Sequence, residues 1–468
     1  ADRRRHLLVS ASVQSFGLKR SREVPASHGL RTATAATTLT RHVKELQGIA
    51  VLPTYRLIIL ATLAVATRGF GQVEPIPAPL PPAGPVVILT SQALDGHGAT
   101  LEDARIGIVD GKITSLDARE DGTVIDLREY TVLPGWIDTH VHLGSHFNAE
   151  GRIATEEEPP MEAAMGIAQA AWNTLMGGFT TVQTVGEMSE RPLRDAIRDH
   201  GFPGPRVLTS LEWVTGTTES TPEELLAQVR ERKEQGADLV KIFASASQRV
   251  GATPTITEAQ LKLLCDEVHR LGMRSMVHAY RSQVAAAARA GCMQIEHATY
   301  ATKEELQVAV DHGTYISPQV GLVVQSYLAN KARYLGVGNY TEEGMQTMKR
   351  DMVHDFEVCS LAASLPGARL VFSTDATAGA HGRNAEEFIG RVEYCGQTPM
   401  EALVSAAKIA AEAMGMENQI GKLAPGYEAD IIALDGDPLT DLSAVNRVVF
   451  VMRGGVIYKW PGAAARRR

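Results

Sequence analysis

The sequence predicts an α/β fold, in which a (β/α)8 TIM barrel is joined to a small β-sandwich domain formed by both chain ends. Two observations lead to this fold class. Between residues 131 and 375, eight short apolar runs of strand length alternate with segments whose apolar residues recur every three to four positions. On either side of this region, short strand-like runs are separated by Gly and Asp turns, which is typical of a small β domain.

The expected barrel strands are almost continuous apolar runs, as in parallel sheets that are buried on both faces. They are residues 131–142, 180–185, 206–211, 239–243, 274–278, 293–297, 314–318 and 369–375. Helical spacing predicts helices at residues 162–175, 222–235, 257–271, 303–312, 342–363 and 399–414. Thr257 is expected to begin the third of these helices, because a threonine ahead of a helical pattern favours a capped start.

The β-sandwich is expected to combine residues 86–130 with residues 417–460, which leaves residues 131–416 for the barrel. Its short strands are expected at residues 86–90, 105–109, 113–116, 124–127, 430–434, 448–451 and 456–460. Residues 73–85 are dense in proline and predict an extended linker.

The segment 1–72 is expected to be a leader or signal-like or disordered segment. Residues 57–66 form an apolar run of ten behind Arg56, which is too short to span a bilayer but fits the core of a signal peptide. We therefore expect no stable membrane span and an exported protein, periplasmic or secreted. A cytoplasmic location is the alternative.

Composition excludes some classes of protein. The 468 residues are 44% hydrophobic and 21% charged, as in an ordinary soluble globular protein. The net charge is -8, and the body of the chain is more acidic than this because both ends are rich in arginine. An acidic body argues against nucleic-acid binding. The four cysteines form no CxxC pair, so buried free thiols are expected rather than a zinc knuckle.

Potential metal ligands fall at the ends of several expected strands. His140 and His142 end the first strand, and alternation along a strand lets both imidazoles face one ion. In barrels of this type, the C-terminal ends of the strands line the active site. The residues at these ends are His140, His142, Lys241, His278, His297 and Asp375. Four imidazoles, one lysine and one carboxylate form the ligand set of a paired-metal hydrolase.

Lys241 is an unexpected neighbour for two metal ions, because they would repel its ammonium group. If the amine reacts with CO2, it becomes a carbamate, an anion whose two oxygens can bridge two metals. The number of ligands, rather than their spacing, leads us to expect this CO2-derived carbamate.

These segments in this order resemble the amidohydrolase superfamily over residues 86–460, specifically its prolidase-like and imidazolonepropionase-like branch. The segments that carry the resemblance are the His-x-His that follows Leu133-Pro134-Gly135, then Val240-Lys241, Glu296-His297-Ala298, Thr374-Asp375 and residues 421–430. The resemblance implies two divalent metal ions, zinc being expected, with manganese or cobalt as alternatives.

The resemblance also implies a role for each ligand. His140, His142 and Asp375 would bind the more buried metal, and His278 and His297 the more exposed one. Carboxylated Lys241 and a hydroxide would bridge the two ions. Asp375 would be catalytic, because it would take the hydroxide proton and deliver it to the leaving nitrogen.

The implied activity is hydrolysis of the C–N amide bond of small peptides or N-acyl amino acids, prolidase-like or carboxypeptidase-like, by the metal-bridging hydroxide. The alternative is a hydrolase of a cyclic amide or an amide xenobiotic, imidazolonepropionase-like or mycotoxin amidase-like. A non-enzymatic relative that serves as a scaffold is a third hypothesis. Relatives commonly assemble, so a homo-oligomer is expected.

Several residues are candidates for contact with the small-molecule substrate. Tyr280 stands where close relatives often have a second histidine, and it could bind a substrate carboxylate. His146 follows the first strand, while Arg383 and Arg281 are candidate carboxylate ligands. Loops at residues 144–161, 212–220, 244–256 and 319–340 are expected to shape the pocket.

Overall fold

The computed structural model describes residues 84–119, 122–155 and 157–461. All of them belong to one of the two compact units of the chain, residues 77–468. The expected leader, residues 1–72, lies outside the described residues. Within them, helices and strands alternate along most of the chain, and the predicted α/β class is confirmed.

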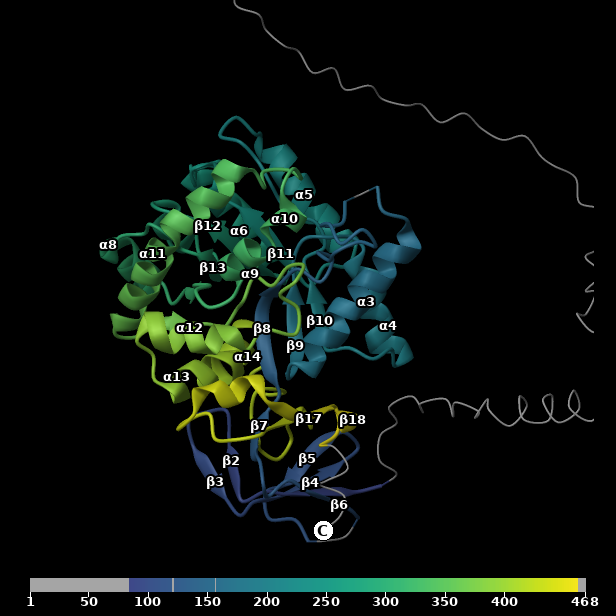
Figure 1. Cartoon of the computed structure of the whole chain (residues 1–468). Helices are drawn as coiled ribbons and strands as arrows, with labels where there is room; N and C mark the ends of the chain where they lie inside the picture. Colours follow the sequence, from purple (N-terminus) through teal and green to yellow (C-terminus); the bar gives the residue numbers. More distant parts are fainter. Residues whose placement is uncertain (1–83, 120–121, 156, 462–468) are drawn as a thin grey trace, which may run out of the picture. The chain divides into compact units, whose positions relative to one another are not determined.

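Eight strands form two parallel sheets, with the orders β10-β9-β8 and β11-β12-β13-β14-β15. Strands β8 to β13 are labelled in Figure 1. They are β8 (Trp136–Val141), β9 (Phe179–Thr184), β10 (Arg206–Thr209), β11 (Leu239–Phe243), β12 (Arg274–Ala279), β13 (Gln294–His297), β14 (Tyr315–Ser317) and β15 (Arg369–Leu370). Isolated parallel bridges join the two sheets, one between Val214 and Ile242 and another between Val141 and Ala376. The strand ends of both sheets are therefore linked.

Most helices lie in the segments between these strands, and the last three follow β15. They are α3 (Pro160–Met176), α4 (Glu190–His200), α5 (Pro222–Glu234), α6 (Glu258–Arg270), α7 (Gln283–Arg289), α8 (Lys303–Asp311), α9 (Val323–Ala329), α10 (Lys331–Tyr334), α11 (Glu342–Ser364), α12 (Glu386–Cys395), α13 (Pro399–Val404) and α14 (Ala410–Ala413). Thr257 caps α6 through reciprocal hydrogen bonds with Gln260, as predicted. Leu225 of α5, Leu264 of α6 and Val277 of β12 share one fully buried cluster. Burial of each such side chain contributes about 1.5–3 kcal/mol.

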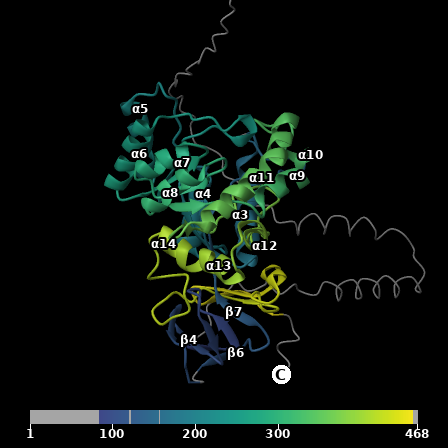
Figure 2. The same cartoon turned by 90° about the vertical axis from the view of Figure 1, so that its left-hand side faces the viewer.

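The remaining strands form two further sheets, with the orders β18-β17-β16-β7-β2-β3 and β5-β4-β1-β6. They are β1 (Val86–Leu89), β2 (Gln92–Leu94), β3 (Thr100–Glu102), β4 (Arg105–Val109), β5 (Lys112–Ser115), β6 (Thr123–Asp126), β7 (Thr131–Pro134), β16 (Ile431–Leu434), β17 (Val448–Arg453) and β18 (Val456–Lys459). Strands from early and late in the sequence lie side by side in the six-stranded sheet (Figure 2). Ile106 of one sheet and Phe450 of the other belong to the same buried cluster.

The single strand expected over residues 131–142 is wrong. β7 pairs with β16 and β2, whereas β8 pairs with β9 in a different sheet. The break falls at Gly135, where an added Cβ would lie only 2.1 Å from Oγ1 of Thr180. The absence of a side chain therefore lets the chain pass from one sheet to the other against Thr180. The apolar pattern of the sequence continues through this junction, so it does not indicate where β7 ends and β8 begins.

Two further expectations need correction. Residues 319–340, expected as a loop, contain the helices α9 and α10. The eighth strand, expected over residues 369–375, is only Arg369–Leu370 as β15. The residues after it still bond to β8, since the backbone N–H of Thr139 donates to Phe372 and that of Asp375 donates to His140.

The expectation of free thiols is also wrong. Two disulfides join Cys265 to Cys292 and Cys359 to Cys395, and they leave no free cysteine. The first joins α6 to the segment before β13, and the second joins α11 to α12. Among the helices of residues 84–461 that are described, none is both long and apolar enough to cross a membrane.

Candidate metal centre

The two parallel sheets bring the predicted ligands to one edge. Carboxyl ends of parallel strands meet on the same side, so residues far apart in the sequence converge there. His140 lies in β8 and His142 directly after it, Lys241 lies in β11, and His278 lies in β12, while His297 ends β13 and Asp375 follows β15. Both His297 and Asp375 have positive φ angles, 67° and 53°. Such backbone conformations are uncommon for residues other than glycine and cluster at functional sites.

His140, His142 and Asp375 form the tightest group, because their potential ligand atoms all lie within 4.8 Å of one another. Oδ1 of Asp375 is 2.9 Å from Nε2 of His142 and 3.3 Å from Nε2 of His140. The two Nε2 atoms are themselves 3.3 Å apart. Two imidazoles and one carboxylate at this spacing are a suitable donor set for a divalent metal ion.

His297 and His278 extend this group. The ring centre of His297 is 5.8 Å from that of His140 and 4.7 Å from that of His278. Nε2 of His278 is buried and has no hydrogen-bond partner among the residues that the structure describes. Buried polar atoms nearly always have a partner. The atom without one fits a metal ion bound beside it, since a neutral imidazole nitrogen is a common metal ligand.

Lys241 lies directly against the group. Its Nζ is 3.2 Å from Nε2 of His140 and 3.6 Å from Sδ of Met276, and the residue is only 1% exposed. Burial lowers the pKa of Lys241 to about 8, although the charges of Glu296 and Asp375 raise it. The structure therefore places the buried amine of Lys241, on β11, among the imidazoles.

Burial and nearby charges shift the pKa values of four other ligands. It lowers the pKa of His140, lowers that of His278 well below its usual value, and brings that of His297 to about 3. Burial alone would raise the pKa of Asp375, but the charge of His140 and the hydrogen bond with His142 hold it well below its usual range. Neutral imidazoles and an ionised carboxylate are the forms that bind metals.

Glu296 orients His140 and was given no role in the sequence analysis. Its Oε2 accepts a hydrogen bond of 2.6 Å from Nδ1 of His140, and both side chains are almost fully buried. Burial would raise the pKa of Glu296, but the charge and hydrogen bond of His140 bring it to about 2. A carboxylate bonded to one ring nitrogen fixes the other nitrogen as the ligand atom. The signal in the sequence for this orienting role was the acidic residue directly before His297.

Asp138 performs a second positioning task that the sequence analysis missed. Its carboxylate accepts hydrogen bonds from the backbone N–H (3.1 Å) and Oγ1 (2.6 Å) of Thr374, and from Nδ2 of Asn384 (2.8 Å). Thr374 precedes Asp375, so these bonds tie the segment that bears Asp375 to β8. Asp138 lies two residues before His140, on the same face of the strand.

The residues predicted to bind substrate lie in three different places. The ring of Tyr280 is 4.7 Å from that of His278 and 5.4 Å from that of His297, so Tyr280 joins the group. His146 instead bonds to Glu158, with 2.7 Å between Nε2 and Oε2, and lines a hollow of about 810 Å³. Arg383 pairs with Glu386 at 2.7 Å and lines another hollow.

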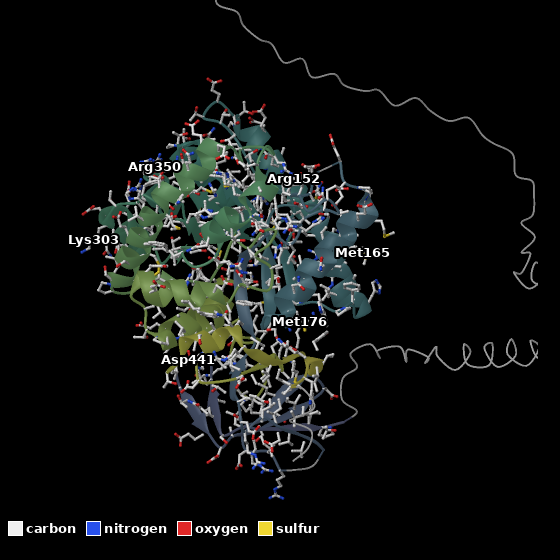
Figure 3. All side chains as sticks on the ribbon, viewed as in Figure 1. Arg152, Met165, Met176, Lys303, Arg350 and Asp441 are labelled. Atoms are coloured by element: carbon white, nitrogen blue, oxygen red, sulfur yellow. A yellow bond between two sulfur atoms is a disulfide. The ribbon has the colours of Figure 1, made fainter. Side chains whose placement is uncertain are left out.

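Neither of these two hollows is lined by a candidate ligand. The first also contains Met165 of α3, which is 66% exposed and points away from the strands (Figure 3). The structure therefore brings Tyr280, but not His146 or Arg383, to the candidate metal centre.

A cavity of about 50 Å³ borders the ligands, and Tyr280, His297 and Asp375 line it. Arg249 also lines this cavity and was missed by the sequence analysis. It belongs to a short 3-10 helix, Gln248–Val250, in the loop after β11. The loop was expected to shape the pocket, but its sequence does not indicate which side chain faces the ligands.

Residues 131–458 match the model of the amidohydrolase family, so the chain belongs to the amidohydrolase family. Members of this family are metal-dependent. The expectation that this chain is a hydrolase acting on carbon–nitrogen bonds of the amide or peptide class is confirmed.

The similar proteins include hydrolases with different named activities. Ochratoxinase of Aspergillus niger is 24% identical over 431 residues, which cover 80% of this chain and 87% of that protein. Imidazolonepropionase of Symbiobacterium thermophilum is 25% identical over 396 residues, covering 73% and 84% of the two chains. A crystal structure of a Xaa-Pro dipeptidase with bound methionine is 27% identical with a TM-score of 0.72, covering 80% of this chain and 100% of the other.

Proposed function

We propose that this protein is a binuclear metal-dependent amidohydrolase that cleaves the C–N amide bond of small peptides or N-acyl amino acids. One observation carries the proposal. Four imidazoles, a lysine and an aspartate converge at the carboxyl ends of parallel strands, and a buried imidazole nitrogen among them has no hydrogen-bond partner. The similarity to the Xaa-Pro dipeptidase supports a peptide-like substrate.

The proposal includes the architecture that holds these residues. We propose that the two parallel sheets close into one (β/α)8 barrel over residues 136–416. The bridges at Val214–Ile242 and Val141–Ala376 support closure, because they lie at both junctions between the sheets. The buried cluster shared by the other two sheets supports a β-sandwich formed by residues 86–134 and 417–460.

The six side chains would hold two divalent metal ions, and zinc suits their imidazole-rich donor set. Lys241 is buried, and no carboxylate of the described residues lies within ion-pair distance of its Nζ. Conversion to a carbamate would replace this isolated buried cation with an anionic ligand between the two histidine groups. When bound, the metals lower the pKa of a water molecule and polarise the scissile carbonyl.

The protein residues supply orientation and proton transfer. Asp375 has its Oδ1 directed at both His140 and His142, and its backbone N–H bonds to the carbonyl of His140. This position allows Asp375 to accept a proton from the attacking water and return it to the leaving nitrogen. Tyr280 lies beside His278 and His297, where its hydroxyl can bond to the substrate.

A second candidate activity is hydrolysis of a cyclic amide or an amide xenobiotic. The observation that favours it is the similarity to ochratoxinase and imidazolonepropionase. The same metal centre would serve both activities, so the choice depends on the residues that surround the cavity.

We also propose that the protein is exported. Two disulfides among the described residues support this location, because disulfides persist mainly in oxidising compartments. Assembly into a homo-oligomer remains a prediction, and light scattering of the purified protein would measure it.

The proposed activity can be tested with metal-free protein reconstituted with zinc, manganese or cobalt. The substrates are Xaa-Pro and Xaa-Arg dipeptides, N-acyl amino acids and cyclic amides. We expect hydrolysis of the first three classes only after metal addition, and a loss of about 10²- to 10⁴-fold in Asp375→Asn. Asp351→Asn, whose carboxylate bonds to Tyr300 and Arg350, is the matched control. Full turnover without metal would contradict the proposal.

A further inference from the structure

We propose that Arg249 binds the carboxylate of the substrate. The enzyme would then select amides whose amine portion is an amino acid with a free carboxylate. This inference rests on the proposed function, because it assigns a specificity-determining residue and a substrate class to the same site. Three properties of Arg249 lead to it, namely its place, its lack of an anionic partner and its rigid support.

The place of Arg249 is the cavity that borders the candidate metal centre. Arg249 lines this cavity together with His297 and Asp375, both candidate ligands, and with Tyr280. A substrate whose scissile amide lies at the ligands would therefore have its adjoining groups close to Arg249. In an N-acyl amino acid, the carboxylate is two bonds from the amide nitrogen, so it is the nearest charged group to the cleaved bond.

Arg249 has only neutral partners. Its Nε donates to Oδ1 of Asn339 at 2.8 Å, and its Nη1 contacts Sδ of Met348 at 3.5 Å. A guanidinium has five N–H donors arranged as a fork that fits a carboxylate. Among the residues that the structure describes, no carboxylate forms an ion pair with Arg249. The side chain thus retains donors and an uncompensated charge in a partly buried position.

Two carboxylates line the same cavity, and neither neutralises Arg249. Asp375 is directed at His140 and His142. Asp355 accepts a hydrogen bond of 2.5 Å from Oγ1 of Thr299, and burial raises the pKa of Asp355 to about 7. An anion supplied by the substrate would therefore be the first full partner of this guanidinium.

Aromatic rings support Arg249 in one position. Its guanidinium carbon lies 4.2 Å from the ring centre of Tyr340 and 5.5 Å from that of Tyr327. Stacking on aromatic faces restricts an arginine without using its N–H donors. Binding of a carboxylate then requires little further ordering of the side chain.

The arginines considered from the sequence are placed differently. Arg281 is exposed and stacks on Tyr300, with 4.3 Å between the guanidinium carbon and the ring centre. Arg383 pairs with Glu386. Of Arg249, Arg281 and Arg383, only Arg249 lines the cavity beside the ligands.

The test compares two substrates that differ in one group, N-acetyl-L-phenylalanine and N-acetyl-2-phenylethylamine, which lacks the carboxylate. The wild-type, metal-reconstituted full chain is expected to prefer the acid. In Arg249→Gln, kcat/KM for the acid should fall by about 10- to 100-fold, mainly through KM, because a charge-assisted hydrogen bond is lost. The value for the carboxylate-free amide should stay unchanged, and Arg249→Lys should retain part of the preference.

Binding without turnover separates this inference from the proposed function. Isothermal titration calorimetry of N-acetyl-L-phenylalanine is carried out on metal-free and metal-loaded protein. If neither amide is hydrolysed, the proposed function fails, but at least tenfold weaker binding of the acid by Arg249→Gln would still support the inference. Absence of binding by the wild-type protein, or equal binding by wild type and variant, would overturn it.

A matched control comes from the start of β15. Arg369 also stacks on a tyrosine, 4.0 Å from the ring centre of Tyr315, but it pairs with Glu412. Arg369→Gln should leave the preference for the acid unchanged. Thermal unfolding should show that Arg249→Gln is folded. If Arg281→Gln removes the preference while Arg249→Gln keeps it, Arg281 is the carboxylate ligand and the inference is wrong.

Discussion

Replacement of Glu296 by glutamine should weaken metal binding without unfolding the protein. The carboxylate accepts three hydrogen bonds on Oε2, from His140, Ser317 and Gln319, and one on Oε1, from Gln294. A glutamine whose amide oxygen takes the place of Oε2 keeps the first three bonds and loses only the fourth. The main change is then the loss of the negative charge opposite His140.

The size of this effect follows from the hydrogen bond to His140. A bond to a charged group contributes about 1.5–3 kcal/mol and a neutral bond about 1 kcal/mol, so the loss is about 0.5–2 kcal/mol. Partners of metal-bound histidines typically contribute 10- to 100-fold to metal affinity or activity. The two ranges overlap between about 10- and 30-fold, so we expect metal affinity at His140 to fall by about 10- to 30-fold in Glu296→Gln.

Competition with a chromophoric chelator would measure this affinity. The matched control is Glu267→Gln, whose buried carboxylate pairs with the exposed Arg230 and Arg270 and does not contact the ligands. The control should bind metal as the wild-type protein does. Wild-type metal affinity in a folded Glu296→Gln variant would refute the orienting role of Glu296.

Two further predictions concern stability. The unreduced, denatured protein should contain no thiol that reacts with a maleimide, and four reactive thiols would contradict the disulfides. Reduction should lower the free energy of unfolding by about 3–4 kcal/mol per disulfide, because the two disulfides close loops of 27 and 36 residues. Gly135→Ala should lower the free energy of unfolding, measured by chemical denaturation, by about 1–3 kcal/mol, because its Cβ would meet Thr180. Adding Thr180→Ala should restore part of that loss. A Gly135→Ala variant as stable as the wild-type protein would contradict the close approach.

The candidate ligands were predictable from the sequence because their signals are local. A lysine or a histidine within a short apolar run is conspicuous, and strand alternation places His140 and His142 on one face. The run of β11 is bounded by the turn at Gly236, so its limits, Leu239–Phe243, matched the prediction. The α/β class followed in the same way from the alternation of strand and helix patterns.

Other features depend on contacts between distant segments, and local patterns do not record these. Arg249 lies in the cavity only because the loop after β11 folds towards Tyr327 and Tyr340. Each disulfide joins cysteines on different elements, so spacing alone could not pair them. The residues after β15 bond to β8, which lies more than two hundred residues earlier in the chain, and Phe372 donates its backbone N–H to Ser405 rather than to β14.

Metal content per chain in wild-type protein and in Lys241→Ala tests the central claim most directly. Elemental analysis after reconstitution should find about two divalent ions in the wild type. Lys241→Ala should lose both metal and activity, and short carboxylic acids should restore part of the activity by taking the place of the carbamate. Two tightly bound ions in Lys241→Ala would contradict the bridging role, and a wild-type protein that binds none would contradict the metal centre itself.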